Sequence, residues 1–376
     1  MFTYDYRRAQ FDPRTRSLWR YRDLLPIKSR ENEVSLGEGQ TPLIRSRLDL
    51  GCELWLKDEG RNPTGSMKDR ALSVAVSAAR EAGKTRVIIA STGSAGMAAA
   101  AYAARAGMRC LVLVPRPTTR ERLVVMAALG AEVLEVDAAF ERLAEIIAEA
   151  RRHGWEELTT YRQANAFQAE GPKTIAYEVF EALGAAPDAV IVPVGGGGTL
   201  AAIWQGFKDL LHMGRVERLP RMVGVQNVHF NALELSLQRG LTTEEEIKGL
   251  NLDPDVQVLT RNLKHAFPHD SLPALEALRE SGGTVVTATD EEAVQAQVQV
   301  ARADGIFTEP SSAVTLVAVR KLAEAGKLDH RSRVCALVSG SGLREVQTAV
   351  ETIPLRIPEV SAEEALARVQ QSEIGL

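Results

Sequence analysis

Residues 189–207 read AVIVPVGGGGTLAAIWQGF: an apolar β-branched run, four consecutive glycines, and then a segment whose apolar residues have helical spacing. A buried strand that ends in a loop and continues into a helix is the unit from which parallel α/β sheets are built. Because the glycine cluster interrupts the uncharged run, a membrane-spanning helix is the less favoured interpretation. This stretch predicts one strand–loop–helix unit of a parallel sheet.

The same pattern recurs along the chain. Further short apolar runs that end at glycine, proline or polar residues are RVIIASTG (86–93), RCLVLVP (109–115), AEVLEV (131–136), RMVGVQ (221–226), GTVVTA (283–288) and RVCALVSGSG (333–342). Alanine-rich segments with helical spacing lie between them, at 71–84, 94–107, 141–154 and 291–305. Alternating strands and helices predict an α/β protein with largely parallel sheets flanked by helices.

Composition narrows the class of protein further. The chain has 376 residues, 45% of them apolar and 25% charged, which is typical of a soluble globular protein of two domains. Its formal net charge of −4 gives no reason to expect nucleic acid or a membrane surface as a partner. Three scattered cysteines and a charged N-terminus without an apolar core predict a cytoplasmic protein. The six histidines have no metal-ligand spacing, so no metal site is expected.

Residues 62–70, NPTGSMKDR, form a turn-rich loop that runs into a predicted helix and places Lys68 at its start. The helix dipole disfavours a cation there, which lowers the pKa of the amine and makes it a better nucleophile. The alternative is a solvent-exposed Lys-Asp-Arg face after a turn.

The stretch STGSAG (91–96) joins a strand to a helix through small residues, whose free N–H groups suit a carboxylate or a phosphate. A tight connection that needs small side chains is the alternative. A late SGSG (339–342) also follows a strand, and either offers a hydroxyl at the sheet edge or caps a loop. Glu309 is either a buried carboxylate or a loop acid before Pro310.

The tetraglycine at 195–198 brings bare backbone to a helix N-terminus, where a phosphate binds well. Gly196, Gly198 and Ala201 also match the dinucleotide pattern G-x-G-x-x-A. A dinucleotide site needs an acidic residue at the end of the next strand, and that strand ends in Gln226 and Asn227. Phosphate binding is therefore favoured over a nicotinamide dinucleotide.

In their order along the chain, these motifs resemble those of fold-type II pyridoxal 5′-phosphate (PLP) enzymes, the tryptophan synthase β-like superfamily, and most closely those of threonine synthases. The motifs are SLGEGQTPL (35–43), LKDEGRNPTGSMKDR (56–70), STGSAG (91–96), GPKTIAYE (171–178), PVGGGGTL (193–200), EPSSA (309–313) and SGSGLRE (339–345). The resemblance covers most of the chain and implies PLP as cofactor.

The resemblance also implies roles for individual residues. Lys68 would form the Schiff base with PLP and act as the catalytic acid–base group. Ser339 would face the pyridine nitrogen, where a neutral hydroxyl favours elimination or replacement over transamination. The residues implied to hold the cofactor phosphate are Gly195, Gly196, Gly197, Gly198 and Thr199, and those implied to bind the substrate are Ser66, Ser91, Thr92, Gly93, Arg162 and Gln168.

Two departures from the family pattern bear on the substrate. Ser94 stands where relatives carry an asparagine that contacts the 3′-oxygen of PLP, and serine is too short for that contact without a water. Residues 162–168, RQANAFQ, replace a stretch like NSxNPxR that binds the substrate phosphate in threonine synthases, so Gln168 takes the place of an arginine. Losing such a charge-assisted contact weakens binding by about 2 kcal/mol, unless Arg162 compensates.

The resemblance implies residues 1–70 as an N-terminal arm and the first part of a large PLP domain, 71–159 as a smaller inserted α/β domain, and 160–376 as the remainder of the large domain. The implied activity is β,γ-elimination and replacement on an amino acid such as O-phosphohomoserine, giving threonine, in a homodimer. The alternative is β-elimination or β-replacement on the same fold, as in a serine/threonine dehydratase or a phosphoserine-using synthase such as cysteate synthase. A non-catalytic amino-acid- or PLP-binding protein is a third hypothesis, prompted by Ser94.

Overall fold

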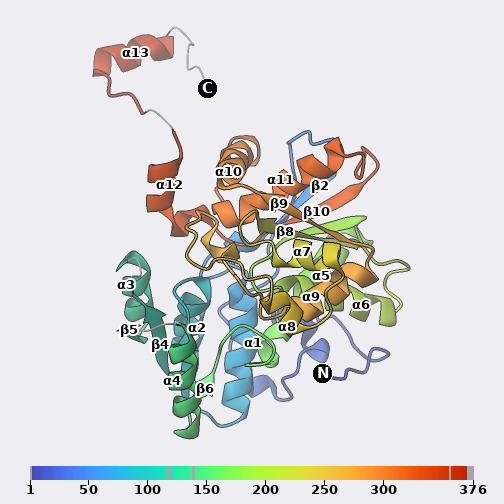
Figure 1. Cartoon of the computed structure of the whole chain (residues 1–376), viewed down its shortest axis with the longest axis vertical. Coiled ribbons are helices and arrows are strands. Elements are labelled where there is room, and N and C mark those ends of the chain that lie inside the picture. The colour runs from blue at the N-terminus through green and yellow to red at the C-terminus, as the bar shows by residue number, and fades with distance from the viewer. Residues whose placement is uncertain (1, 117–119, 138–139, 355–356, 371–376) are drawn as a thin grey trace.

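The computed structural model describes residues 2–116, 120–137, 140–354 and 357–370 (Figure 1). Two separate sheets with helices packed on their faces make up the architecture, as the alternating pattern predicts. Among the described residues, no helix is long and apolar enough to cross a membrane.

The larger sheet has six strands in the spatial order β1-β2-β10-β7-β8-β9. Their bounds are β1 Leu43–Arg45, β2 Glu53–Asp58, β7 Ala189–Pro193, β8 Arg221–Asn227, β9 Thr284–Ala288 and β10 Arg333–Val338. All neighbouring pairs are parallel except β1 with β2. Since β2 lies beside β10, segments from both ends of the chain build this sheet.

The smaller sheet has four strands in the order β5-β4-β3-β6, and every pair is parallel. The strands are β3 Arg86–Ala90, β4 Arg109–Pro115, β5 Glu132–Val136 and β6 Glu156–Glu157. Its helices are α2 Ser94–Ala106, α3 Arg120–Ala128 and α4 Phe140–Arg152. Figure 1 shows this group of elements to one side of the larger sheet, with α1 between the two.

Helices cover both faces of the larger sheet. They are α5 Thr174–Leu183, α6 Gly198–His212, α7 Ala232–Arg239, α8 Glu244–Lys248, α9 Ser271–Glu280, α10 Asp290–Asp304 and α11 Pro310–Glu324. Helix α1, Lys68–Glu81, packs instead against α2 and contributes to the core of the smaller sheet. The last two, α12 Val346–Thr352 and α13 Ala362–Gln370, extend away from the body (Figure 1). Helix α13 ends at Gln370, and residues 371–376 lie outside the described residues.

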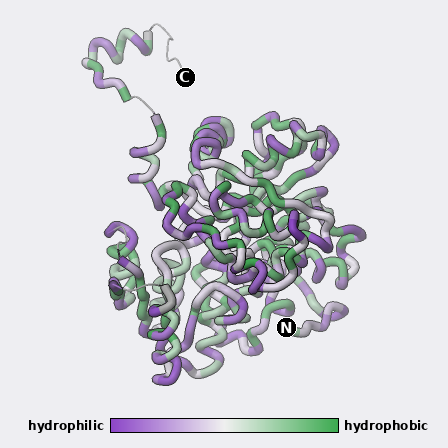
Figure 2. The backbone as a smooth tube through the Cα atoms, in the orientation of Figure 1, coloured by the Kyte–Doolittle hydropathy of each residue, from purple (hydrophilic) through white to green (hydrophobic). Residues whose placement is uncertain are grey.

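The core has a separate layer on each face of the larger sheet. One layer contains Val190 and Val192 of β7 together with Phe207 of α6, and the other contains Ile191 with Val317 of α11. Adjacent residues of β7 therefore face opposite layers, as a strand buried on both faces requires. Figure 2 shows that hydrophobic residues are concentrated in the middle of the larger body, where these strands lie.

The N-terminal segment buries its aromatic and aliphatic side chains. Leu18, Trp19, Leu25 and Ile27 form a small cluster with Val74 of α1. This contact fixes the outer side of the helix that begins at Lys68.

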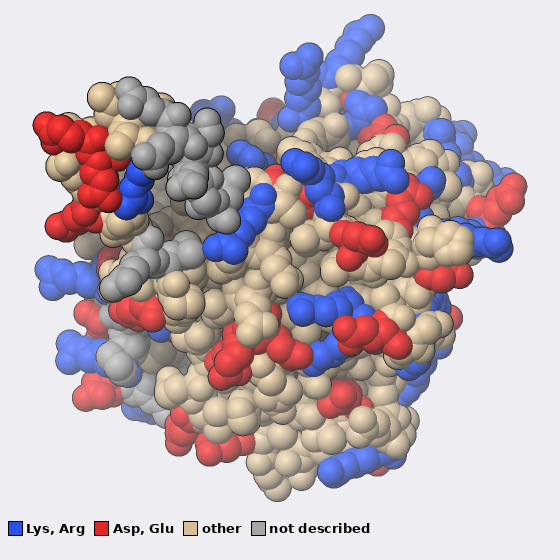
Figure 3. Space-filling model, turned by 90° about the horizontal axis from the view of Figure 1, so that it is seen from above, with Lys and Arg blue, Asp and Glu red and all other residues tan. Residues whose placement is uncertain are grey.

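Acidic and basic side chains are interspersed over the face shown in Figure 3.

Candidate active site

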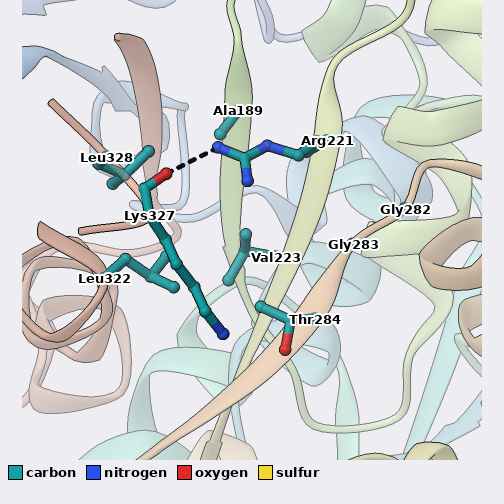
Figure 4. A pocket seen from close by; sticks show the side chains of 9 residues that line it. All are labelled: Ala189, Arg221, Val223, Gly282, Gly283, Thr284, Leu322, Lys327 and Leu328. Carbon is teal, nitrogen blue, oxygen red and sulfur yellow. Dashed lines mark hydrogen bonds between the residues drawn. The ribbon is translucent and has the colours of Figure 1, made fainter. Parts of the chain in front are cut away.

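The motifs meet at one edge of the two sheets, because each follows the carboxyl end of a parallel strand. β3 ends just before Ser91, β7 just before the tetraglycine, and β10 just before Ser339. Ligands of open α/β sheets bind at this edge. A cavity of about 320 Å³ lies instead at the amino ends of β7, β8 and β9 and is no part of this site (Figure 4).

Lys68 is the first residue of α1, as predicted. Its Nζ lies 3.3 Å from Thr160 Oγ1. Burial lowers the pKa of the Lys68 amine, and the nearby Asp270 carboxylate opposes that shift. A lowered pKa increases the fraction of neutral amine, which is the nucleophilic form.

The residues that follow Lys68 anchor the start of the helix in the interior. Asp69 accepts hydrogen bonds from the backbone N–H and the hydroxyl of Thr64. Arg70 Nε donates to Glu59 Oε2 at 2.6 Å, and its Nη1 donates to Glu178 Oε1 at 2.5 Å. Asp69 and Arg70 are fully buried, so the solvent-exposed interpretation of the Lys-Asp-Arg segment is wrong. Two carboxylates compensate the buried guanidinium, a pairing that sequence spacing does not reveal.

Backbone hydrogen bonds join the Lys68 loop to the Ser339 loop. Met67 N–H donates to Ser339 O, and Ser341 N–H donates to Gly65 O, both at 2.9 Å. Ser66, buried, pairs with Gly340 across this short antiparallel bridge, and its Oγ accepts from Lys68 N–H at 3.3 Å. The predicted cofactor anchor and the predicted nitrogen partner are therefore held side by side.

The tetraglycine loop leads into α6 with its N–H groups free. Gly197 precedes the helix with φ of 95°, a conformation suited to glycine, and no side chain caps the helix. The backbone N–H groups of residues 195–199 donate no hydrogen bond to any described residue. Free N–H groups and the positive end of a 15-residue helix form a site for an anion.

The segment around residues 262–270 packs on this loop. A Cβ at Gly195 would collide with Asn262 O and lie 3.0 Å from His265 Nε2. A Cβ at Gly198 would collide with the Asp270 carboxylate. Burial raises the pKa of the Asp270 carboxyl. Burial also lowers the pKa of His265 to about 4, and the charges of His269 and Lys68 add to that shift. His265 is therefore a neutral imidazole near pH 7, next to the predicted phosphate site.

The loop at 91–96 lies close to the same segment. Asn262 Oδ1 would lie 3.8 Å from a Cβ at Gly93, so Asn262 is near both the tetraglycine and this loop. Ser91 Oγ accepts hydrogen bonds from the N–H groups of Gly93 and Gly96, and Thr92 O accepts one from Arg122. Ser94 Oγ accepts a 2.8 Å hydrogen bond from Arg344 Nη2.

Ser339 is buried beside two polar side chains. Its Oγ lies 2.7 Å from Ser312 Oγ and 3.4 Å from Glu309 Oε1. Glu309 is therefore a buried carboxyl next to the site, which decides the alternative that the sequence leaves open. Burial raises the pKa of Glu309, and the charge of Arg344 opposes the shift.

The substituted stretch 162–168 is linked to the site at one end. Arg162 N–H donates to Asp270 Oδ1 at 3.0 Å, and Arg162 Nε is buried without a hydrogen-bond partner among the described residues. Gln168 is buried, and its N–H donates to Asn165 Oδ1. Arg162 is thus the residue of this stretch that the structure ties to the Lys68 neighbourhood through Asp270.

Sequence reasoning missed several residues that the structure places here. They are Thr160, Asn262, His265, Asp270, Arg122 and Arg344. Arg344 lies in the quoted motif SGSGLRE, which is a usable signal. His265 and Asp270 lie in a stretch with weak periodicity, which carries none.

A family model described as pyridoxal-phosphate dependent enzyme matches residues 34–340. The chain belongs to this family. It is 36% identical over 339 residues to a threonine synthase from Methanocaldococcus jannaschii, with 89% of this chain and 82% of that protein covered. A threonine synthase from Halalkalibacterium halodurans is 35% identical, with 90% of this chain and 93% of that protein covered. The protein is a PLP-dependent lyase similar to threonine synthases.

The fold comparison agrees with this family. The processed form of threonine deaminase isoform 2 from Solanum lycopersicum has a TM-score of 0.71 at 20% identity, with 87% of this chain and 91% of that chain covered. The predicted fold-type II architecture is confirmed.

The residues present fit PLP on structural grounds. A phosphate needs several N–H donors, and residues 195–199 offer them unpaired at a helix N-terminus. An aldehyde needs a neutral amine, and burial lowers the pKa of Lys68 in that direction. The ring nitrogen needs a polar partner, and Ser339 lies beside the Lys68 loop.

Proposed function

We propose that the protein catalyses β,γ-elimination and replacement on an amino acid with a leaving group on Cγ, such as O-phosphohomoserine, to give threonine. In that reaction the Cγ–O bond breaks, phosphate leaves, and the oxygen of water adds at Cβ. Similarity to threonine synthases over about nine-tenths of the chain is the observation that carries this proposal.

We assign the residues as follows. PLP, when bound, withdraws electrons from the substrate α-carbon and so stabilises the charge that develops there. The Nζ of Lys68 anchors the cofactor and then moves protons at the substrate carbons. The N–H groups of residues 195–199 hold its phosphate. The hydroxyl of Ser339, which carries no charge, forms a hydrogen bond with the ring nitrogen of the cofactor.

The amino-acid end of the substrate binds at the α2 N-terminus in this proposal. Ser66, Ser91, Thr92 and Gly93 lie on the two loops that flank Lys68 and α2. Ser91 Oγ accepts from the N–H groups of Gly93 and Gly96, and the positive end of α2 supports carboxylate binding beside them. Arg162, whose buried Nε has no hydrogen-bond partner in the described part of the chain, is the candidate for the phosphate of the substrate.

One observation favours a second candidate, a β-eliminating or β-replacing enzyme that acts on serine, threonine or phosphoserine. Gln168 is buried and neutral at the position where the resemblance implies a phosphate-binding arginine. If Arg162 does not replace that arginine, phosphohomoserine loses a charge-assisted contact.

We also propose the domain division 1–70, 71–159 and 160–376, a cytoplasmic location and a homodimer. All four strands of the smaller sheet lie between residues 86 and 157, which supports the inserted domain. Two contacts connect the smaller sheet's elements to the segment after β10. They are a hydrogen bond from Arg344 to Ser94 and an ion pair between Arg122 and Glu345. Closure of the two parts over a ligand would exclude water. Sedimentation equilibrium tests the dimer.

A steady-state assay separates the two functions. We expect purified protein with PLP to release phosphate from O-phosphohomoserine and to form threonine. Ammonia and a 2-oxoacid from serine or threonine, without phosphate release from phosphohomoserine, would support the second candidate instead. Lys68→Ala serves as the control for both, since a non-catalytic binding protein would turn over no amino acid in either form.

A further inference from the structure

Arg344 places a buried guanidinium among the loops of the site. It ends a short 3₁₀ helix, Gly342–Arg344, directly after the Ser339 loop. Its side chain is 11% exposed. The Nη2 group donates to Ser94 Oγ at 2.8 Å, whereas Nε and Nη1 are buried without a hydrogen-bond partner among the described residues.

The surrounding backbone is shaped to admit this side chain. A Cβ at Gly65 would lie 2.5 Å from Arg344 Cδ, so the glycine three residues before Lys68 leaves room for the arginine stem. The guanidinium therefore lies between the Lys68 loop, the N-terminus of α2 at Ser94, and the Ser339 loop from which it projects.

Glu309 forms a long ion pair with Arg344 but accepts no hydrogen bond from its free donors. Its Oε2 lies 3.7 Å from Arg344 Nη1, beyond hydrogen-bond distance, and that oxygen is itself buried and unpartnered among the described residues. Burial also raises the pKa of Glu309, which weakens it as a counter-charge. Buried donors of a guanidinium are costly when unpaired, and such groups in folded proteins normally have a partner.

A purely structural role is already filled nearby. Arg122 and Glu345 form an ion pair between the segment that starts α3 and the segment that starts α12. That pair connects the smaller sheet to the segment after β10. The link between the smaller sheet and the segment after β10 therefore does not explain why Nε and Nη1 of Arg344 are buried without hydrogen bonds to described residues.

We propose that Arg344 binds an anionic oxygen of the molecules held at this site, with Nε and Nη1 as the donors. The proposal rests on the proposed function, since it supplies that site with a recognition residue that the motif roles leave out. The oxygen belongs either to the cofactor ring or to the carboxylate of the amino-acid substrate. A planar guanidinium with two free N–H groups suits both.

The experiment compares wild type, Arg344→Gln and Arg344→Lys, with Arg20→Gln as a matched control that breaks a partly buried ion pair with Glu181 away from the site. Binding of PLP is titrated by its absorption spectrum, without substrate. We expect Arg344→Gln to weaken PLP about 10- to 100-fold or to shift the absorption maximum if the oxygen is on the cofactor. If it is on the substrate, PLP binding stays normal and KM rises by a similar factor at unchanged kcat.

The outcomes separate this proposal from the proposed function. A change in PLP affinity or spectrum supports the role of Arg344 even if phosphohomoserine is not a substrate. PLP affinity, spectrum and KM within about twofold of wild type in both Arg344 variants, or the same changes in Arg20→Gln, would overturn it. If Arg344→Gln does not fold, Arg344→Lys decides, because it keeps the charge and removes the two-pronged geometry.

Discussion

The hydroxyl of Ser339 lies 3.4 Å from Oε1 of Glu309, and Ser312 Oγ contacts Ser339 at 2.7 Å. The side chain that we assign to the ring nitrogen is thus backed by a carboxyl that burial tends to keep protonated. A neutral Glu309 leaves the Ser339 hydroxyl, and not a carboxylate, as the group that faces the cofactor. This arrangement agrees with elimination and replacement chemistry.

We expect Glu309→Gln to become more stable relative to wild type as the pH rises. The pKa of Glu309 is raised in the folded state, so the folded protein holds a proton that the unfolded chain has already lost above its ordinary pKa of about 4.3. Wild type therefore loses stability over that interval, and glutamine, which does not titrate, does not. Urea unfolding of both proteins at pH 5 and pH 8 measures the difference. A wild-type stability that stays constant or rises with pH relative to Glu309→Gln would show that the pKa of Glu309 is not raised in the fold.

Arg70→Ala should destabilise the protein by about 3–5 kcal/mol, because it leaves Glu59 and Glu178 buried without their cation. Arg61→Ala is the matched control: Arg61 is 63% exposed and pairs with Asp58, so its loss should cost no more than about 1 kcal/mol. Chemical denaturation of the two variants gives both values. Equal costs would mean that the Arg70 cluster does not anchor α1.

The same cluster sets an expectation for acid. Charges of Arg70 and Lys57 lower the pKa of Glu178 to about 2 despite its burial. A carboxyl with a lowered folded pKa contributes stability that is complete above about pH 4.3 and lost as the pH falls toward 2. We expect wild type to lose stability over this range more steeply than Glu178→Gln, which is less stable at pH 7. Parallel stability profiles of the two proteins between pH 5 and pH 2.5 would contradict the assignment.

Two glycines at opposite ends of α6 separate backbone strain from cofactor binding. Gly197 and Gly214 both have positive φ, but a Cβ at Gly197 would lie 2.7 Å from Asp270 O, whereas one at Gly214 meets nothing within 4 Å. Gly214→Ala should cost about 1–2 kcal/mol and leave PLP affinity unchanged. Gly197→Ala should also weaken PLP at least about tenfold, since it displaces the N–H groups of the loop. Equal PLP affinity in the two variants, measured by absorption titration, would remove the tetraglycine from the phosphate site.

Much of the fold follows from hydrophobic patterning. Every apolar run quoted from the sequence forms a strand. Central strands such as β7 are buried on both faces and need a continuous apolar run, whereas the edge strand β5 is mostly exposed. The missed strands lack that pattern. In β2, the buried Lys57 pairs with Glu178 of a distant helix and the buried Asp58 pairs with Arg61, and β6 has just two residues. The stretch 240–273 lacks a clear hydrophobic period, and it holds the short α8, a 3₁₀ turn and the first residues of α9.

The site was predictable where a motif fixes local geometry. Lys68 at a helix start and the tetraglycine before α6 are such cases. Their neighbours His265 and Asp270 were not, since contacts made by the 262–270 segment depend on how distant parts of the chain pack. The burial of Arg70 and the position of Glu309 behind Ser339 likewise arise from tertiary structure.

The most direct test of the central claim is to locate the cofactor on the chain. Protein loaded with PLP is reduced with borohydride, digested, and the modified peptide is identified by mass spectrometry. We expect the pyridoxyl group on Lys68 and its absence in Lys68→Ala. Labelling of another buried lysine, Lys57 or Lys173, in place of Lys68 would contradict the assignment of this site.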